Sequence, residues 1–266
     1  MISARSVLLG MVSSLVLVIA TIGAGGCGGG SASGVVASVG GGTVTRDAVN
    51  HWMQTLGAGE FYELSKGHEV PVGLASDPPN YQGCASVLER VTVTAVGRPK
   101  PDGAQLLNKC RELHQALRLQ AAEFLVNTLW TEGVLRDLGL TATAGEVQQK
   151  LHRVTSEQFP KPGALSHYLA PRRRSLADEL VLMKLDLLSE KATARIKTGG
   201  KPFVVRLTEA EQRWSSKTTC HQGYVVAHCT QYTPASRPAS LASPAALMEQ
   251  VAHMTGVPCI SKQACP

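Results

Sequence analysis

The sequence has few aromatic residues and no long run of charge of one sign. Phe, Trp and Tyr make up 5% of the 266 residues, and they form no series on which nucleic-acid bases could stack. The net charge of +6 is mild, and it is not gathered into one long run. These features exclude nucleic acid as the expected partner, while a mildly basic chain is compatible with a place near an anionic membrane surface.

The sequence also lacks the signatures of an organised catalytic site. It has no nucleophile elbow and no phosphate-binding glycine loop, because the glycines at 28–30 and 40–42 are typical of a tether and a turn. The histidines outside the C-terminal cysteine pair show no metal-ligand spacing, and we expect His114 and His152 on helix surfaces. We therefore predict neither catalytic residues nor a cofactor or metal. The histidines considered are His51, His68, His114, His152, His167 and His253.

The N-terminus has the pattern of an export signal over residues 1–26. Arg5 precedes an apolar run at 7–22 that is short for a membrane span. The small residues before Cys27 resemble a bacterial lipobox, with Ala24 where leucine is usual. We predict that Cys27 is lipidated and holds the protein on the extracytoplasmic face of the membrane, with residues 27–34 as a flexible tether. Simple secretion and an uncut anchor are the alternatives.

The cysteine count favours disulfides in an exported chain. Apart from Cys27 there are six cysteines, an even number that permits 15 pairings. Proximity in the sequence favours three pairs, Cys84–Cys110, Cys220–Cys229 and Cys259–Cys265. A zinc site at Cys220, His221, His228 and Cys229 is the alternative for the second pair, but adjacent ligands in an extended chain point to opposite faces.

A long helical pattern at 102–138 organises the rest of the chain. Apolar residues recur at helical spacing with no proline, which predicts one helix roughly 50 Å long. Such a helix needs shorter neighbours on its apolar stripe, so we expect a mainly α domain. The positions are Leu106, Cys110, Leu113, Leu117, Phe124, Leu125, Leu129, Val134 and Leu138.

Shorter elements are predicted on both sides of the long helix. Residues 34–57 fit a strand, a tight turn and a helix capped by Thr45, and 58–101 fit a long connection rich in proline and glycine. Helices follow at 139–160, with a Thr143–Glu146 capping box, at 162–170, and at 175–197, with Ser175 as N-cap and Asp178 as its partner. Residues 233–266 have the composition of a flexible tail.

Two stretches resemble the N-terminal domain of SurA-type and PrsA-type foldases. VVASVGGGTVTRDAVNHWM matches its first pattern, with Gly40 in place of an asparagine and Val49 in place of an aromatic residue. GLTATAGEV, Phe159 and SLADELVLMKLDLLSEK follow in the family's order. The resemblance covers about 35–198, and it implies a SurA N-terminal-like helical domain with a short N-terminal β segment.

Full-length members of that family continue with a parvulin-type prolyl isomerase domain. Here residues 198–214 are too few to hold one, and 199–232 fit a C-terminal helix followed by a small disulfide-linked element. The resemblance therefore implies a membrane-tethered chaperone, or holdase, that binds unfolded or nascent exported polypeptides in an apolar helical groove. A prolyl isomerase by family descent and a structural lipoprotein scaffold for a protein partner are the alternatives.

Large apolar side chains are the candidates for contact with such clients, although ordinary core packing explains the same residues. Methionine and aromatic side chains suit adaptable apolar contacts. The run Arg172, Arg173 and Arg174 is either a solvated loop or a contact for anionic lipid or an acidic client. The candidate client-binding residues are Trp52, Met53, Phe61, Tyr62, Trp130 and Met183.

Overall fold

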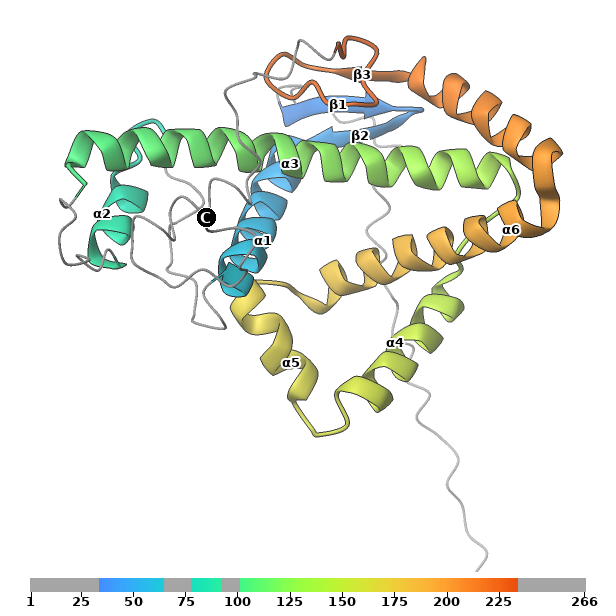
Figure 1. The fold of residues 1–266 in the computed structure, drawn as a ribbon, viewed down its shortest axis with the longest axis horizontal. Helices are drawn as coiled ribbons and strands as arrows, with labels where there is room; N and C mark the ends of the chain where they lie inside the picture. The colour runs from blue at the N-terminus through green and yellow to red at the C-terminus, as the bar shows by residue number, and fades with distance from the viewer. Residues whose placement is uncertain (1–33, 65–77, 92–100, 234–266) are drawn as a thin grey trace, which may run out of the picture. The chain divides into compact units, whose positions relative to one another are not determined.

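The computed structural model describes residues 34–64, 78–91 and 101–233, and in this part the chain is mainly helical (Figure 1). This confirms the predicted mainly α class, with a short N-terminal β segment and a C-terminal disulfide-linked element. The elements, in chain order, are β1 (Val35–Val39), β2 (Gly42–Thr45), α1 (Arg46–Leu64), α2 (Gln82–Val91), α3 (Gly103–Asp137), α4 (Ala144–Gln158), α5 (Ala164–Leu169), the 3-10 turn η2 (Ala170–Arg172), α6 (Leu176–Ser215) and β3 (Thr218–Cys220).

The predicted long helix is present as α3, and α1, α2 and α6 pack against it (Figure 1). Asp102 caps its N-terminus by accepting a hydrogen bond from the backbone N–H of Gln105. The expectation that His114 lies on a helix surface is wrong, because this residue is 9% exposed and its ring centroid lies 5.6 Å from that of Tyr81. His152 is exposed, as expected.

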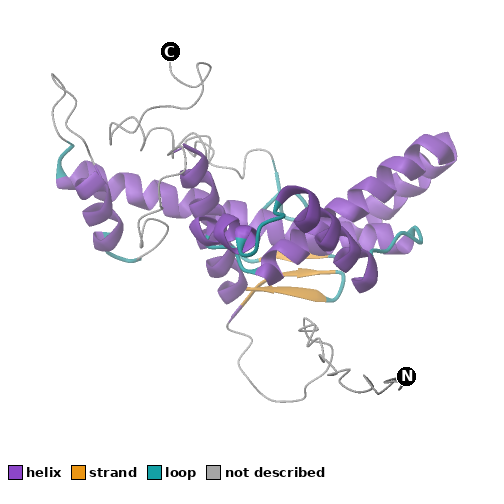
Figure 2. Ribbon diagram, turned by 90° about the horizontal axis from the view of Figure 1, so that it is seen from below, coloured by secondary structure: helices purple, strands orange, loops and turns teal. Residues whose placement is uncertain are grey.

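The strands form one antiparallel sheet in the order β2-β1-β3, and they lie together beside the helices (Figure 2). The sequence pattern predicted only β1. Strand β2 returns after a turn in which Gly40 and Gly41 have positive φ values, a conformation that favours glycine. Strand β3 comes from the other end of the described chain, so residues 199–232 complete the sheet that residues 35–45 begin.

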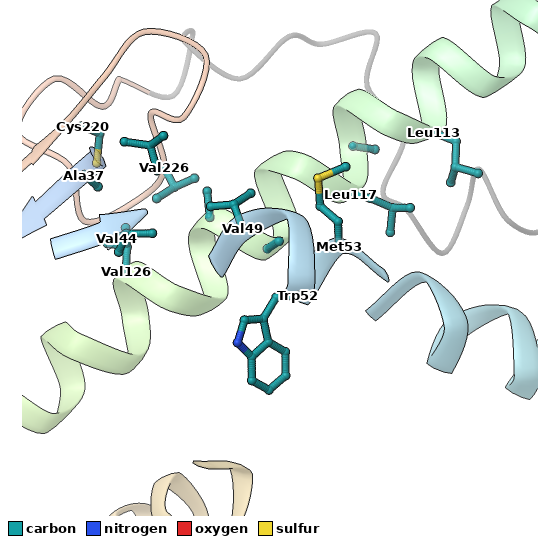
Figure 3. Packing of buried hydrophobic residues seen from close by; sticks show 14 of the residues in the cluster. Ala37, Val44, Val49, Trp52, Met53, Leu113, Leu117, Val126, Cys220 and Val226 are labelled. Carbon is teal, nitrogen blue, oxygen red and sulfur yellow. The ribbon is translucent and has the colours of Figure 1, made fainter. Parts of the chain in front are cut away.

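The main core lies where the sheet and α1 meet the middle of α3. Val49 and Met53 of α1 are buried beside Leu117 and Val126 of α3 (Figure 3). The Trp52 ring packs on that of Phe124, with 4.2 Å between their centroids. The face of α1 that carries these side chains is therefore committed to the core.

The predicted long connection at 58–101 contains more helix than its composition suggested. Helix α1 continues to Leu64, and α2 includes Cys84, which forms a disulfide with Cys110 of α3. This disulfide confirms the predicted pairing and attaches α2 to the long helix. Residues 65–77 and 92–100 of this connection lie outside the described part of the chain.

Helix α6 extends beyond its predicted end at residue 197 and reaches Ser215. Its direction changes at Gly200, whose φ of 55° and ψ of −153° are not helical, and Pro202 follows this bend (Figure 1). The helix resumes because Phe203, Ala210 and Trp214 are buried along its second half. None of the described helices is both long enough and apolar enough to span a membrane.

Candidate functional site

The six candidate client-binding residues do not form one exposed surface. Trp52 and Met53 are buried in the main core, at 6% and 1% exposure, so the folded structure does not present them to a client. Trp130 is half-buried and stacks on His228. The side chains of Phe61 and Tyr62 lie outside those that the structure describes.

Met183 is the one candidate that belongs to a separate apolar cluster, between α4 and α6. We call this group the α4–α6 cluster. Its buried members are Val147, Met183 and Leu187, and its half-buried members are Ala142, Leu151, Val154 and Leu180. Because the group is small, half-buried side chains form much of it, in contrast to the extensive core around α3.

Lys150 bridges the two helices beside this cluster. Its side chain is 8% exposed, and its ammonium group donates hydrogen bonds to the carboxylates of Asp186 and Glu190, which are mostly exposed. Burial opposes the charged form, but the hydrogen bonds to the two carboxylates outweigh burial and raise the pKa of Lys150. Lys150 therefore remains charged while its aliphatic stem lies next to the apolar cluster.

A second ionic contact holds the N-terminus of α4. Lys191 of α6 donates to Glu146 over 2.5 Å and to the carbonyl oxygen of Thr141 over 2.6 Å. Glu146 also accepts hydrogen bonds from the backbone N–H and the hydroxyl of Thr143, which confirms the predicted capping box. The hydrogen bond from Lys191, followed by those from Thr143, lowers the pKa of Glu146 to about 2.

Two arginines of the run before α6, Arg172 and Arg174, are packed into the folded structure. The Arg172 side chain lies over the Tyr168 ring, 4.0 Å from its centroid, and Arg172 is 9% exposed. Arg174 donates to Glu179 over 3.1 Å. For Arg172 and Arg174 the interpretation as a solvated loop is therefore wrong, and Arg172 offers little surface to a lipid or a client.

Ser175, Asp178 and His51 meet where α1 packs near the start of α6. Asp178 accepts a 2.7 Å hydrogen bond from the Ser175 hydroxyl, and its other carboxylate oxygen lies 2.7 Å from His51 Nε2. Burial would raise the pKa of Asp178, but the hydrogen bonds from Ser175 and His51 lower it. The carboxylate stands between the hydroxyl and the imidazole, so His51 is not placed to activate Ser175 as a base. We interpret the group as the predicted helix cap, extended to fix α1 on α6.

The C-terminal cysteine pair is a disulfide, as predicted, and its loop packs on α3. Because Cys220 and Cys229 are bonded to each other, their thiolates are not available to zinc. His228 stacks on Trp130 with 4.1 Å between ring centroids, and its Nε2 lies 3.1 Å from Asn127 Oδ1. Burial lowers the pKa of His228, and the charge of Glu123 opposes this effect without reversing it. In the described ranges, no three His, Cys, Asp or Glu side chains are grouped to hold a metal ion.

Comparison of the chain with protein-family models, with curated proteins and with solved structures finds no match. Three of the predicted cysteine positions are not described. Cys27, the predicted lipidation site, and the pair Cys259 and Cys265 lie outside the described residues. The candidate site therefore depends on the geometry of the α4–α6 cluster.

Proposed function

We propose that the protein is an extracytoplasmic, membrane-tethered chaperone of the holdase type, with the α4–α6 cluster as its client-binding surface. In this proposal Cys27 carries the lipid anchor and unfolded exported polypeptides are the clients. Binding is weak and has little sequence preference. No chemical step is involved, in keeping with the absence of catalytic patterns in the sequence.

The proposal depends on the small size of the α4–α6 cluster and on the partial exposure of its outer side chains. Only three of its side chains are buried, while Leu151, Val154 and Leu180 are half-buried around them. An apolar client side chain that covers these three removes further apolar area from water, which contributes on the order of 1 kcal/mol for each side chain covered. Met183 is itself buried at 5% exposure, so it would not meet a client directly, but its unbranched side chain can adjust when the half-buried residues around it are covered.

Helix α4 is held by few buried contacts, which suits a surface that adjusts to its ligand. Apart from the apolar cluster, α4 is attached to α6 by the ion pairs of Lys150 and Lys191. A helix held by few buried contacts opens locally at lower free energy than the main core does. Charges of both signs beside the cluster would not select clients by their charge.

The resemblance to foldase N-terminal domains supports the same function. The helices that the sequence patterns predicted after the long helix are present as α4, α5 and α6, while α2, between α1 and α3, was not predicted. The second half of α6 and strand β3 occupy the stretch where the family's isomerase domain would follow. The resemblance thus favours client binding over prolyl isomerisation, because the isomerase domain of the family would have to lie in a stretch that α6 and β3 occupy.

A light-scattering assay tests the proposal. A form beginning at Gly34 is added to a chemically unfolded client under oxidising conditions, and its folding is checked by circular dichroism. We expect suppression of aggregation near a stoichiometric ratio, also after deletion of 233–266. If the folded protein does not suppress aggregation, the holdase is excluded and the scaffold interpretation is favoured.

Paired variants of α4 then locate the surface. Leu151→Ser with Val154→Ser makes the cluster polar, whereas Gln148→Ser with His152→Ser changes exposed positions of the same helix. We expect the first pair to lose suppression and the second to retain it. Equal activity of the two pairs would show that clients bind elsewhere.

A further inference from the structure

The bend of α6 carries an unusual concentration of exposed apolar side chains. We call residues 195–206 the α6 elbow. Ile196, Val204 and Val205 are 40%, 43% and 56% exposed, and they are three of the four large hydrophobic residues that are exposed in the described part of the chain. Exposed aliphatic side chains gathered in one short segment indicate an interaction surface more than scattered ones do.

The same segment is strongly basic. Between Glu190 and Glu209 there is no acidic residue, while the sequence has five lysines and arginines. Lys191 is engaged with Glu146, but the other four are exposed, and no ion pair joins them to a carboxylate in the described residues. These four cations of the elbow are Arg195, Lys197, Lys201 and Arg206.

The elbow is a packed structure and not a frayed helix end. Phe203 is 5% exposed and lies directly against Gly199, where an added Cβ would stand 2.7 Å from the Phe203 Cβ. The Arg195 guanidinium carbon lies 6.0 Å from the centroid of the Phe203 ring. Because Phe203 holds the bend from within, Val204 and Val205 are presented to solvent by a defined backbone.

We propose that the α6 elbow binds an anionic lipid surface. The four cations would contact lipid phosphates, and Ile196, Val204 and Val205 would enter the headgroup region. Cationic and aliphatic side chains together are typical of segments that lie in a membrane interface. The elbow has no exposed aromatic side chain on which nucleic-acid bases could stack.

The predicted lipid anchor would also place the domain next to a bilayer. The sequence predicts a lipid anchor at Cys27, joined to the domain by a short tether, which would keep the elbow close to phospholipid headgroups. Contact at the elbow would add a second attachment and fix one orientation of the domain. The elbow is distinct in residues from the α4–α6 cluster, so lipid binding and client binding can fail independently.

Hydrogen–deuterium exchange of the full chain reconstituted in vesicles tests this site. Local exchange reports the elbow even when an N-terminal segment holds all variants on the membrane. On vesicles of phosphatidylcholine with phosphatidylglycerol, we expect the amides of 195–206 to exchange about tenfold more slowly than on phosphatidylcholine alone. Equal exchange on the two kinds of vesicle would overturn the proposal.

Charge-reversal variants provide the matched control. Lys197→Glu with Lys201→Glu should abolish the slowing, and Val204→Ser with Val205→Ser should reduce it. Arg153→Glu with Lys161→Glu makes the same change in net charge at exposed positions outside the elbow, and it should leave the slowing intact. If this control also lost the slowing, the effect would depend on the net charge of the protein and not on the elbow, which would overturn the proposal. Protection by soluble polyglutamate as strong as that by vesicles would instead assign the elbow to an acidic protein.

Discussion

The indole of Trp214 lies directly against the backbone of Gly133. A Cβ built on Gly133 would stand 2.2 Å from Trp214 Cη2, which is closer than side-chain atoms approach one another. The indole N–H donates a 2.9 Å hydrogen bond to the carboxylate of Asp137, one turn further along α3. The missing side chain of Gly133 is therefore what lets the end of α6 return onto α3, and β3 begins four residues after Trp214.

Gly133→Ala should destabilise the protein although alanine is the better helix former. The extra methyl group forces Trp214 away, and overpacking of this kind costs about 1 to 3 kcal/mol, more than the roughly 1 kcal/mol gained in helix propensity. Gly145→Ala in α4, where nothing crowds the added Cβ, is the control and should be neutral or stabilising. Urea unfolding measures both variants, and equal stabilities would contradict the tight packing of Trp214.

The two disulfides should contribute unequally to stability. The Cys84–Cys110 bond spans 26 residues and the Cys220–Cys229 bond spans 9. Loop-closure entropy predicts about 3.5 kcal/mol for the first and about 2.6 kcal/mol for the second. Unfolding of Cys84→Ser/Cys110→Ser and Cys220→Ser/Cys229→Ser double variants measures the two. A larger loss for the second pair would show that the packing of its loop on α3 dominates over loop closure.

Removing the two carboxylate partners of Lys150 should destabilise the protein more than replacing Lys150 itself. Lys150→Met keeps the apolar stem and leaves Asp186 and Glu190 exposed to water, so we expect a change within about 1 kcal/mol. Asp186→Asn with Glu190→Gln leaves a buried ammonium group without a counter-charge, at a cost of about 3 kcal/mol. Hydrogen exchange in 144–158 measures the local effect. The reverse order would show that the ion pairs, and not the apolar contacts, hold α4.

Glu146 should make stability depend on pH in the acid range. Its pKa is about 2 in the folded protein against an ordinary value of 4.5, so between these pH values the unfolded chain binds a proton that the folded chain does not. Its contribution to stability is therefore complete above pH 4.5 and is lost as the pH falls toward 2. Glu146→Gln should show a shallower fall of unfolding free energy over this range. A slope equal to that of the unchanged protein would contradict the depressed pKa.

Local patterns predicted the helical framework well. The period of apolar residues predicted α3, and hydrogen-bonding side chains at Thr143 and Ser175 predicted the starts of α4 and α6. Proximity predicted both disulfides that lie in the described residues. These features depend on neighbours in the sequence, which explains why the sequence alone was sufficient.

Features that depend on distant residues were missed. The sequence pattern predicted that this helix ends at residue 197, but the packing of Trp214 against Gly133 of α3 holds a second half of α6 in place beyond the bend. Strands β3 and β1 pair although their residues are about 180 positions apart, and no local sequence pattern predicts this pairing. The elbow cations were overlooked because apolar residues separate them in the sequence, and only the structure shows that all four are exposed around the bend of α6.

Hydrogen exchange of α4 in the presence of a client tests the central claim most directly. The client is a reduced, carboxymethylated protein that cannot refold, so its apolar segments stay available. We predict that amides of 144–158 become protected as the client is added, while those of the main core in α3 do not change. Aggregation suppression without any protection in 144–158 would contradict the assignment of client binding to the α4–α6 cluster.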